Sequence, residues 1–137
     1  MTDRRRAGAV LLSVLLLAGC TPTSSTGAAV ETAVADAAGG TFALSDVAGI
    51  TGSAFLVVCP YETEESVEAR LGADWNDFRP SGDEGSQTIA VLDGGQVEPI
   101  ELGRDSVDFC SAAAPWALLP LDTRLAVTES RSVSVAA

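Results

Sequence analysis

The sequence predicts a small α+β domain, with a mainly antiparallel sheet and one helix packed on one face, after a signal peptide and a flexible tether. The continuous apolar run at residues 55–59 is typical of a strand that is buried on both faces. Residues 63–72 carry the start and stop signals of one short helix. Asp93-Gly94-Gly95 joins two further apolar runs, which indicates a hairpin. This order favours a helix lying on an antiparallel sheet.

The first forty residues are expected to form a signal peptide at residues 1–19 and a flexible linker at residues 20–40. The arginines at residues 4–6 precede an apolar run at residues 9–18, which is too short to span a bilayer as a helix. The linker begins with threonine and serine and continues with alanine, so it has little apolar surface to offset its ordering entropy. Alanine favours a helix at residues 28–38, but this segment lacks a wide apolar stripe.

The folded domain is expected at residues 41–130, with a C-terminal tail at residues 131–137. Residues 41–47 begin the domain, because apolar and small side chains start to alternate there. The run at residues 55–59 is then stopped by Pro60. We expect this run to be the central strand of the sheet.

One helix is predicted over residues 64–71. Thr63 is a suitable N-cap, and Gly72 is a suitable left-handed residue to end the helix. Val67 and Leu71 are four residues apart, so they share one face of the helix. This face is expected to pack on the sheet.

The hairpin is predicted from the runs at residues 87–93 and 97–102. Pro99 indicates that the second strand lies at the edge of the sheet, because proline has no backbone N–H to donate. A last strand is expected at residues 123–129, and residues 132–135 either extend it or fray.

Composition excludes several classes of function. The 137 residues contain no histidine and no lysine, which excludes Ser-His-Asp and Cys-His catalysis and removes the commonest zinc ligand. No glycine-rich phosphate loop is present either. Without residues 1–19, the chain keeps 18 acidic residues and five arginines, a net charge of −13. We therefore expect no nucleic-acid partner, no cofactor, no metal and no enzymatic activity.

The tetrad Leu17-Ala18-Gly19-Cys20 closes the apolar run and stands before a stretch rich in threonine and serine. It resembles the lipobox of bacterial lipoproteins. The resemblance implies that the first three residues are recognised by the signal peptidase, and that Cys20 carries a diacylglyceryl group with acyl chains such as palmitate. The lack of lysine and the abundance of alanine, valine, glycine and arginine further resemble actinobacterial lipoproteins. An ordinary secretory signal with a chance cysteine is the alternative.

The lipobox resemblance implies a lipid-anchored protein on the outer, extracytoplasmic face of the cell membrane. With Cys20 lipidated, Cys59 and Cys110 remain as an even pair on the oxidising side of the membrane, and we expect them to form a disulfide. The alternative is a redox or nucleophilic thiol. The sequence does not favour it, because there is no Cys-x-x-Cys motif and no histidine base.

Acidic and aromatic side chains gather in the loop after the predicted helix. Exposed aromatic rings anchor protein interfaces, and carboxylates, which here include Asp83 and Glu84, can cleave glycosides or bind calcium. A core role for the rings and a solvated surface for the acids are the alternatives. The candidate interaction surface consists of Trp75, Asp74, Asp77 and Phe78.

The sequence thus predicts a membrane-anchored, exported lipoprotein whose non-catalytic ectodomain binds an envelope protein or a cell-wall partner. The alternative is a small-ligand binder or a carboxylate-dependent hydrolase that acts on wall glycans. A pocket with two converging acids would favour this alternative, whereas a filled core with an exposed apolar patch would favour the first prediction. Residues 55–75 resemble small bacterial envelope proteins of uncharacterised function, from which no functional residue is carried over.

Overall fold

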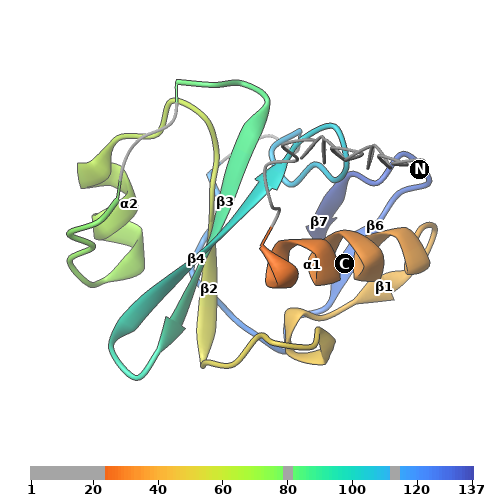
Figure 1. Ribbon diagram of the computed structural model, residues 1–137, viewed down its shortest axis with the longest axis horizontal. Coiled ribbons are helices and arrows are strands. Elements are labelled where there is room, and N and C mark those ends of the chain that lie inside the picture. Colours follow the sequence, from red (N-terminus) through yellow and green to blue (C-terminus); the bar gives the residue numbers. More distant parts are fainter. Residues whose placement is uncertain (1–23, 79–81, 112–114) are drawn as a thin grey trace, which may run out of the picture.

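The computed structural model describes residues 24–78, 82–111 and 115–137. Within these residues the chain forms two α-helices and two antiparallel sheets, so the predicted α+β class is confirmed (Figure 1). The elements in chain order are α1 (Ser25–Asp36), β1 (Thr41–Phe42), the 3-10 helix η1 (Leu44–Asp46), β2 (Ala54–Val58), α2 (Glu64–Leu71), β3 (Ser86–Asp93), β4 (Gln96–Gly103), β5 (Leu119–Pro120), β6 (Leu125–Val127) and β7 (Val133–Val135).

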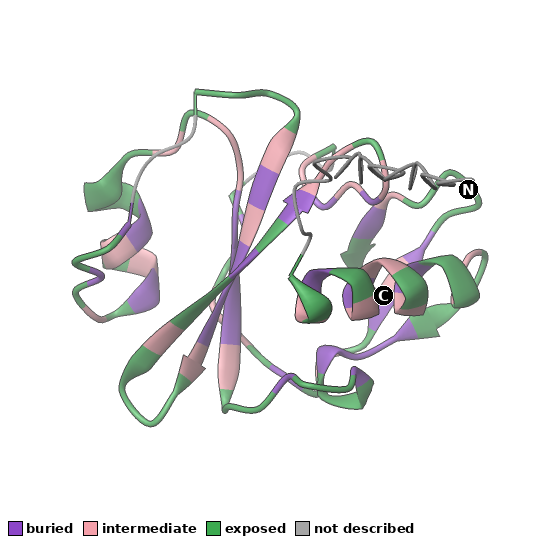
Figure 2. Cartoon of the chain, in the orientation of Figure 1, coloured by how far each residue is buried: buried purple, intermediate pink, exposed green. Residues whose placement is uncertain are grey.

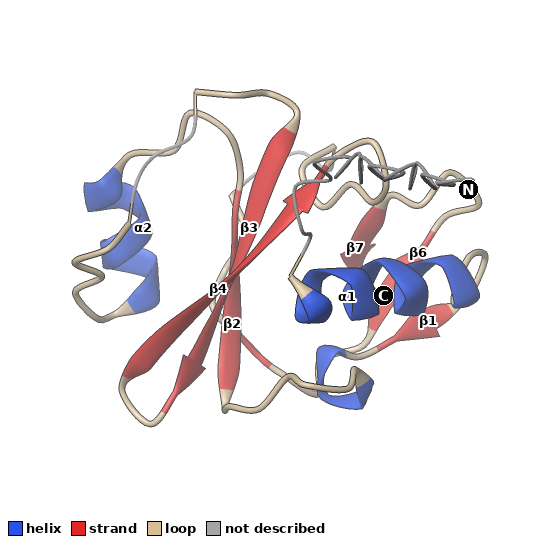
Figure 3. Ribbon diagram, viewed as in Figure 1, coloured by secondary structure: helices blue, strands red, loops and turns tan. Residues whose placement is uncertain are grey.

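Strand β2 is central in a four-stranded sheet of order β4-β3-β2-β5. Its consecutive residues Phe55, Leu56 and Val57 are each 0 % exposed. Because successive side chains of a strand point to opposite faces, this burial requires cover on both sides of the sheet. Helix α2 lies on one side, and α1 with the three-stranded sheet lies on the other (Figure 3). The prediction of a central strand buried on both faces is confirmed.

The hairpin β3–β4 is confirmed and is joined by Gly94 and Gly95. Their φ angles of 57° and 83° are both left-handed, which suits a two-residue turn that follows the twist of the strands. The turn sets a register in which Asp93 lies opposite Gln96. Pro99 lies in β4, which is at the edge of the sheet as predicted.

Helix α2 has the predicted bounds and the predicted caps. The Thr63 hydroxyl accepts a hydrogen bond from the Ser66 N–H at 3.2 Å, and Gly72 ends the helix with a φ of 71°. Val67 and Leu71 are buried, so the apolar face packs on the sheet as expected. Glu64 and Glu65 lie in the first turn, where their carboxylates favour the positive end of the helix dipole.

The three-stranded sheet has the order β1-β6-β7, and it includes part of the expected C-terminal tail. Val133 of β7 is 1 % exposed, and its N–H donates to the Asp108 carbonyl at 2.8 Å. The folded domain therefore continues beyond residue 130. A second sheet was not predicted, because its strands are only two or three residues long and carry little periodicity.

Helix α1 occupies residues 25–36, for which the prediction of a flexible linker does not hold. Ser24 caps its start by accepting a hydrogen bond from the Gly27 N–H at 3.1 Å. Val30 and Val34 lie four residues apart and are each 0 % exposed. Buried and exposed positions alternate along α1 (Figure 2). Two valines on one face suffice because they join the apolar core formed with residues far away in the sequence, which the sequence pattern alone does not reveal. The remaining residues of the predicted linker before Ser24 lie outside the described part of the chain.

Candidate functional site

The predicted lipidation site lies outside the described residues. This applies to Cys20 and to Leu17, Ala18 and Gly19 before it. The first described residue, Ser24, follows Cys20 by four positions and is the N-cap of α1. The chain therefore enters the folded domain almost directly after the tetrad.

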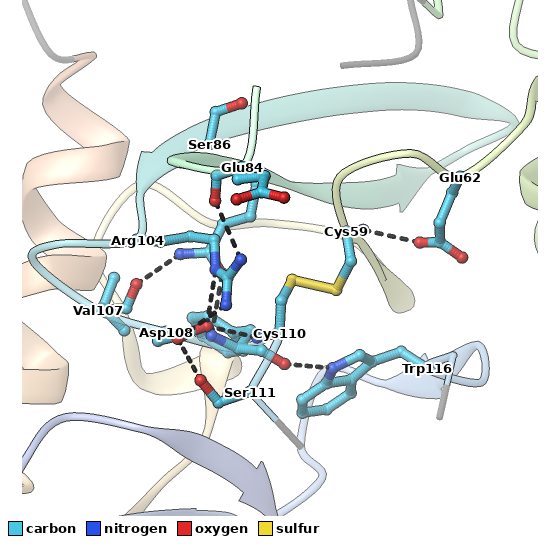
Figure 4. The surroundings of a disulfide bond; sticks show 12 residues. Cys59, Glu62, Glu84, Ser86, Arg104, Val107, Asp108, Cys110, Ser111 and Trp116 are labelled. Atoms are coloured by element: carbon cyan, nitrogen blue, oxygen red, sulfur yellow. Dashed lines mark hydrogen bonds and ion pairs between the residues drawn. A yellow bond between two sulfur atoms is a disulfide. The ribbon is translucent and has the colours of Figure 1, made fainter. Parts of the chain in front are cut away.

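Cys59 and Cys110 form the predicted disulfide (Figure 4). Their Cα atoms are 5.7 Å apart, within the usual range for a disulfide. Cys59 directly follows β2, and Cys110 lies in the segment between β4 and β5, so the bond joins the end of the central strand to a long connection. Both residues are half-buried and pack against the apolar core.

The segment that carries Cys110 is held from inside by Gln87. This side chain of β3 is 2 % exposed. Its amide donates to the Val107 carbonyl at 2.5 Å, and its carbonyl oxygen accepts from the Phe109 N–H at 2.9 Å. A buried amide therefore satisfies two backbone groups that no strand partner reaches, and it fixes the position of the cysteine.

Asp108 holds the same segment from outside. Its carboxylate accepts two hydrogen bonds from the Arg104 guanidinium, both at 3.1 Å, and one from the Cys110 N–H at 2.7 Å. The Ser111 hydroxyl also donates to it (Figure 4). Arg104 in turn donates to the Glu84 carbonyl at 3.0 Å, which joins the loop before β3 to this network.

Ionisation of Asp108 is expected to stabilise the fold. Burial raises the pKa of its carboxyl, but hydrogen bonds from Arg104, Ser111 and the Cys110 N–H more than offset burial, so the pKa lies below its ordinary value of 3.8. The resulting stability is present above the unfolded-state pKa and is lost as the pH falls through the folded-state pKa. We expect Asp108→Asn to lower the free energy of unfolding by about 2 kcal/mol near neutral pH and by much less near pH 2.

Urea denaturation of the wild type and the variant at several pH values measures this dependence. Asp105→Asn is the matched control, because Asp105 is exposed and belongs to the same connection. A difference between wild type and Asp108→Asn that stays constant from neutral to acid pH would contradict the prediction.

The other side of the disulfide is tied to α2. The Glu62 carboxylate accepts from the Cys59 N–H at 2.7 Å and forms an ion pair with Arg70. Arg70 also donates to the Trp116 carbonyl at 2.7 Å. The disulfide thus lies between two hydrogen-bonded networks, an arrangement that serves structure rather than thiol exchange.

The predicted interaction surface is only partly on the surface. Trp75 and Phe78 are 7 % and 4 % exposed, and their ring centroids are 4.9 Å apart. The core alternative is therefore correct for both rings, because they close the space beside α2. Asp74 and Asp77 are exposed. Tyr61, with 64 % exposure, is the most exposed large aromatic of the described chain.

A hollow that the sequence did not predict opens between the start of α1 and the hairpin. It has a volume of about 330 Å³. Ser24 and Thr26 line it from α1, and Ile50 and Thr51 line it from the loop before β2. The floor on the hairpin side includes Val91 of β3. We call it the α1–hairpin hollow.

Two carboxylates line the α1–hairpin hollow. Glu98 lies opposite Val91, and Asp93 lies two residues further along β3. Asp93 and Glu98 are therefore diagonal neighbours on one face of the hairpin. The alternation of side chains along the two strands indicates this shared face. The side of the hollow formed by Ser24 and Thr26 was not predicted, because the sequence analysis expects a flexible linker there.

The loop before β2 is fixed against the hairpin. Its Ser53 N–H donates to the Leu92 carbonyl at 2.9 Å, and its Thr51 hydroxyl donates to the Asp93 carboxylate at 3.2 Å. Gly52 permits this approach, since it has a φ of 148° and a Cβ there would overlap the Leu92 carbonyl oxygen. A second hollow of about 500 Å³ on this loop shares Thr51 and reaches Asp122.

Comparisons of this chain with protein-family models, with curated proteins and with solved structures found no match. Among the described residues, no helix has the length and apolar character needed to cross a membrane. The same residues contain no group of three or more cysteine, aspartate or glutamate side chains arranged to hold a metal ion.

Proposed function

We propose that this protein is an exported lipoprotein, held by a lipid on Cys20 at the outer face of the cell membrane, whose non-catalytic ectodomain binds an envelope protein or a cell-wall partner. The observation that carries the proposal is the tetrad Leu17-Ala18-Gly19-Cys20 at the end of a short apolar run. Two acyl chains on one cysteine are enough for durable anchoring, because each buried methylene contributes about 0.8 kcal/mol.

The Cys59–Cys110 disulfide supports export. Disulfides form and persist outside the cytoplasm, where glutathione and thioredoxin do not keep thiols reduced. Here the bond is built into the core region and flanked by two hydrogen-bonded networks, which is the arrangement of a structural disulfide. A structural disulfide fits a domain that folds on the extracytoplasmic side.

If Cys20 is lipidated as proposed, the position of α1 supports a domain held close to the membrane. The N-cap Ser24 follows Cys20, the proposed lipidated residue, by four positions, so only three residues lie between them. A fully extended chain of this length spans at most about 14 Å. The net charge of −13 after removal of residues 1–19 gives no attraction to anionic headgroups, so the lipid is the only expected attachment to the bilayer.

Replacement of Cys20 tests the proposal. We expect Cys20→Ala to move the protein from the membrane fraction to the medium or to leave an uncleaved precursor, because the acyl chains have no other residue to modify. The measurement is fractionation with mass spectrometry of the purified protein. Thr21→Ala is the matched control and should remain lipidated. A Cys20→Ala protein that is still cleaved and extracted only by detergent would refute lipid anchoring.

The α1–hairpin hollow favours a second candidate, which is a small-ligand binder or a carboxylate-dependent hydrolase of wall glycans. The supporting observation is that Asp93 and Glu98 share one face and line one hollow. Hydrolysis would require both carboxylates to act on one glycosidic bond. Release of sugar from wall glycans by the purified protein, lost in Glu98→Gln, would select this candidate.

A further inference from the structure

We propose that the α1–hairpin hollow binds a cationic peptide segment, with Asp93 and Glu98 accepting hydrogen bonds from a lysine or arginine side chain of the partner. This inference rests on the proposed binding function and names the class of partner. The hollow, at about 330 Å³, falls within the size range of ligand pockets.

The polar groups of the hollow favour a ligand group that donates hydrogen bonds and carries a positive charge. Its side-chain polar groups are carboxylates and hydroxyls, from Asp93, Glu98, Ser24, Thr26 and Thr51. None of the described residues that line it is basic. Carboxylates only accept hydrogen bonds when ionised, whereas ammonium and guanidinium groups only donate them. An anionic segment would be repelled by both carboxylates, of which Asp93 already accepts a hydrogen bond from Thr51.

The apolar part of the hollow suits the stem of such a side chain. Ile50, Val91 and Ile100 line the same space as the two carboxylates. Lysine and arginine bury their methylene stems on apolar surface and keep the charged group at a polar rim. A neutral glycan is less well matched, because the described lining contains no aromatic ring on which a sugar could stack.

The hollow is held in shape before a partner arrives. Hydrogen bonds from Thr51 to Asp93 and from Ser53 to Leu92 fix the loop on the hairpin. Because Gly52 has no Cβ, the backbone of the loop can lie directly against the backbone of β3 at Leu92. A preformed site loses less conformational entropy on binding than a mobile one. The second hollow extends the acidic surface along this loop to Asp122, so an extended segment with several basic residues is matched at both ends.

Binding of a fluorescein-labelled tetralysine peptide to the mature, lipidated protein in detergent micelles tests the inference. Fluorescence anisotropy at about 0.1 M salt limits the contribution of diffuse charge. The triple variant, called the groove variant, combines Asp93→Asn and Glu98→Gln in the α1–hairpin hollow with Asp122→Asn in the second hollow. We expect it to bind about tenfold more weakly than the wild type, which corresponds to about 1.4 kcal/mol over three exposed ion pairs.

The matched control neutralises three exposed acids that line neither hollow, namely Glu65→Gln, Asp105→Asn and Glu129→Gln. It changes the net charge equally, and we expect it to weaken binding by less than about twofold. Equal weakening in the two variants would show a diffuse electrostatic attraction and overturn the inference. No binding of tetralysine to the wild type, or equal binding of a tetraserine peptide, would also overturn it.

Glu98→Gln alone serves if the groove variant does not fold, because Glu98 is exposed in an edge strand. Its expected effect is a two- to threefold weakening, the contribution of about one exposed ion pair. Mass spectrometry of the same preparation reports the lipid on Cys20. A protein without lipid that binds tetralysine would refute the anchoring alone. A lipidated protein that fails the peptide test would refute the inference alone.

Discussion

Loss of the Cys59–Cys110 disulfide is expected to lower the free energy of unfolding by about 4 kcal/mol. The bond closes a loop with a sequence separation of 51 residues. In the chain-entropy description, a cross-link over this distance removes about that much conformational freedom from the unfolded chain. Small domains have total stabilities of about 5–15 kcal/mol, so the loss is a large fraction of the whole.

Urea denaturation of the wild type and of Cys59→Ser with Cys110→Ser measures this effect. The double variant avoids a free thiol that would form mixed disulfides. The wild type in reductant is the second arm and should resemble the double variant. Asp105→Asn, at an exposed position of the same connection, is a control that leaves the disulfide in place. Unchanged urea midpoints in both arms would mean that the hydrogen bonds of Gln87, Asp108 and Glu62 hold this region without the cross-link.

Replacement of Trp116 by alanine is expected to destabilise the domain by about 3–5 kcal/mol. Trp116 is 6 % exposed, and its ring centroid lies 6.3 Å from that of Phe55 and 5.8 Å from that of Phe109. Its indole N–H donates to the Phe109 carbonyl at 2.7 Å. Alanine would leave a cavity beside the central strand and remove the donor from a buried carbonyl.

Trp116→Phe separates the two contributions. It keeps most of the apolar surface and loses the indole donor, so we expect a loss of about 1 kcal/mol. Unfolding is followed by circular dichroism. The fluorescence of Trp75, the remaining tryptophan of both variants, is an independent probe, since its backbone N–H donates to Glu68 of α2. Equal stability of wild type and Trp116→Ala would show that Trp116 does not support the core. If the alanine variant does not fold, the phenylalanine variant still measures the hydrogen bond.

The predicted elements that hold in the structure share a local cause. Thr63 and Gly72 bound α2 because each provides a capping conformation within one turn of the helix. Gly94 and Gly95 adopt the left-handed φ angles that a two-residue hairpin turn requires. Pro99 lies in the edge strand because proline has no backbone N–H to donate to a neighbouring strand. Each of these features depends on one residue or a few neighbouring residues, so it can be predicted from the sequence alone.

The features that were missed depend on residues far apart in the chain. Helix α1 has a small apolar face, and Val30 and Val34 are buried in a core that includes residues of distant strands. The rings of Trp75 and Phe78 have the same appearance in the sequence whether they close a core or anchor an interface. The α1–hairpin hollow requires α1, the loop at Gly52 and the hairpin together, and no local pattern predicts their meeting.

The α+β class, the central strand, α2, the hairpin and the pairing of Cys59 with Cys110 are predictable from the sequence. The disulfide is predictable because Cys59 and Cys110 are the pair that remains if Cys20 carries a lipid. Packing in three dimensions is needed to show that α1 belongs to the domain, that residues 133–135 add a strand, and that Asp93 and Glu98 line one hollow. Capping, turn and donor effects act over a few residues, whereas burial and the shape of a surface arise from the packing of the whole chain.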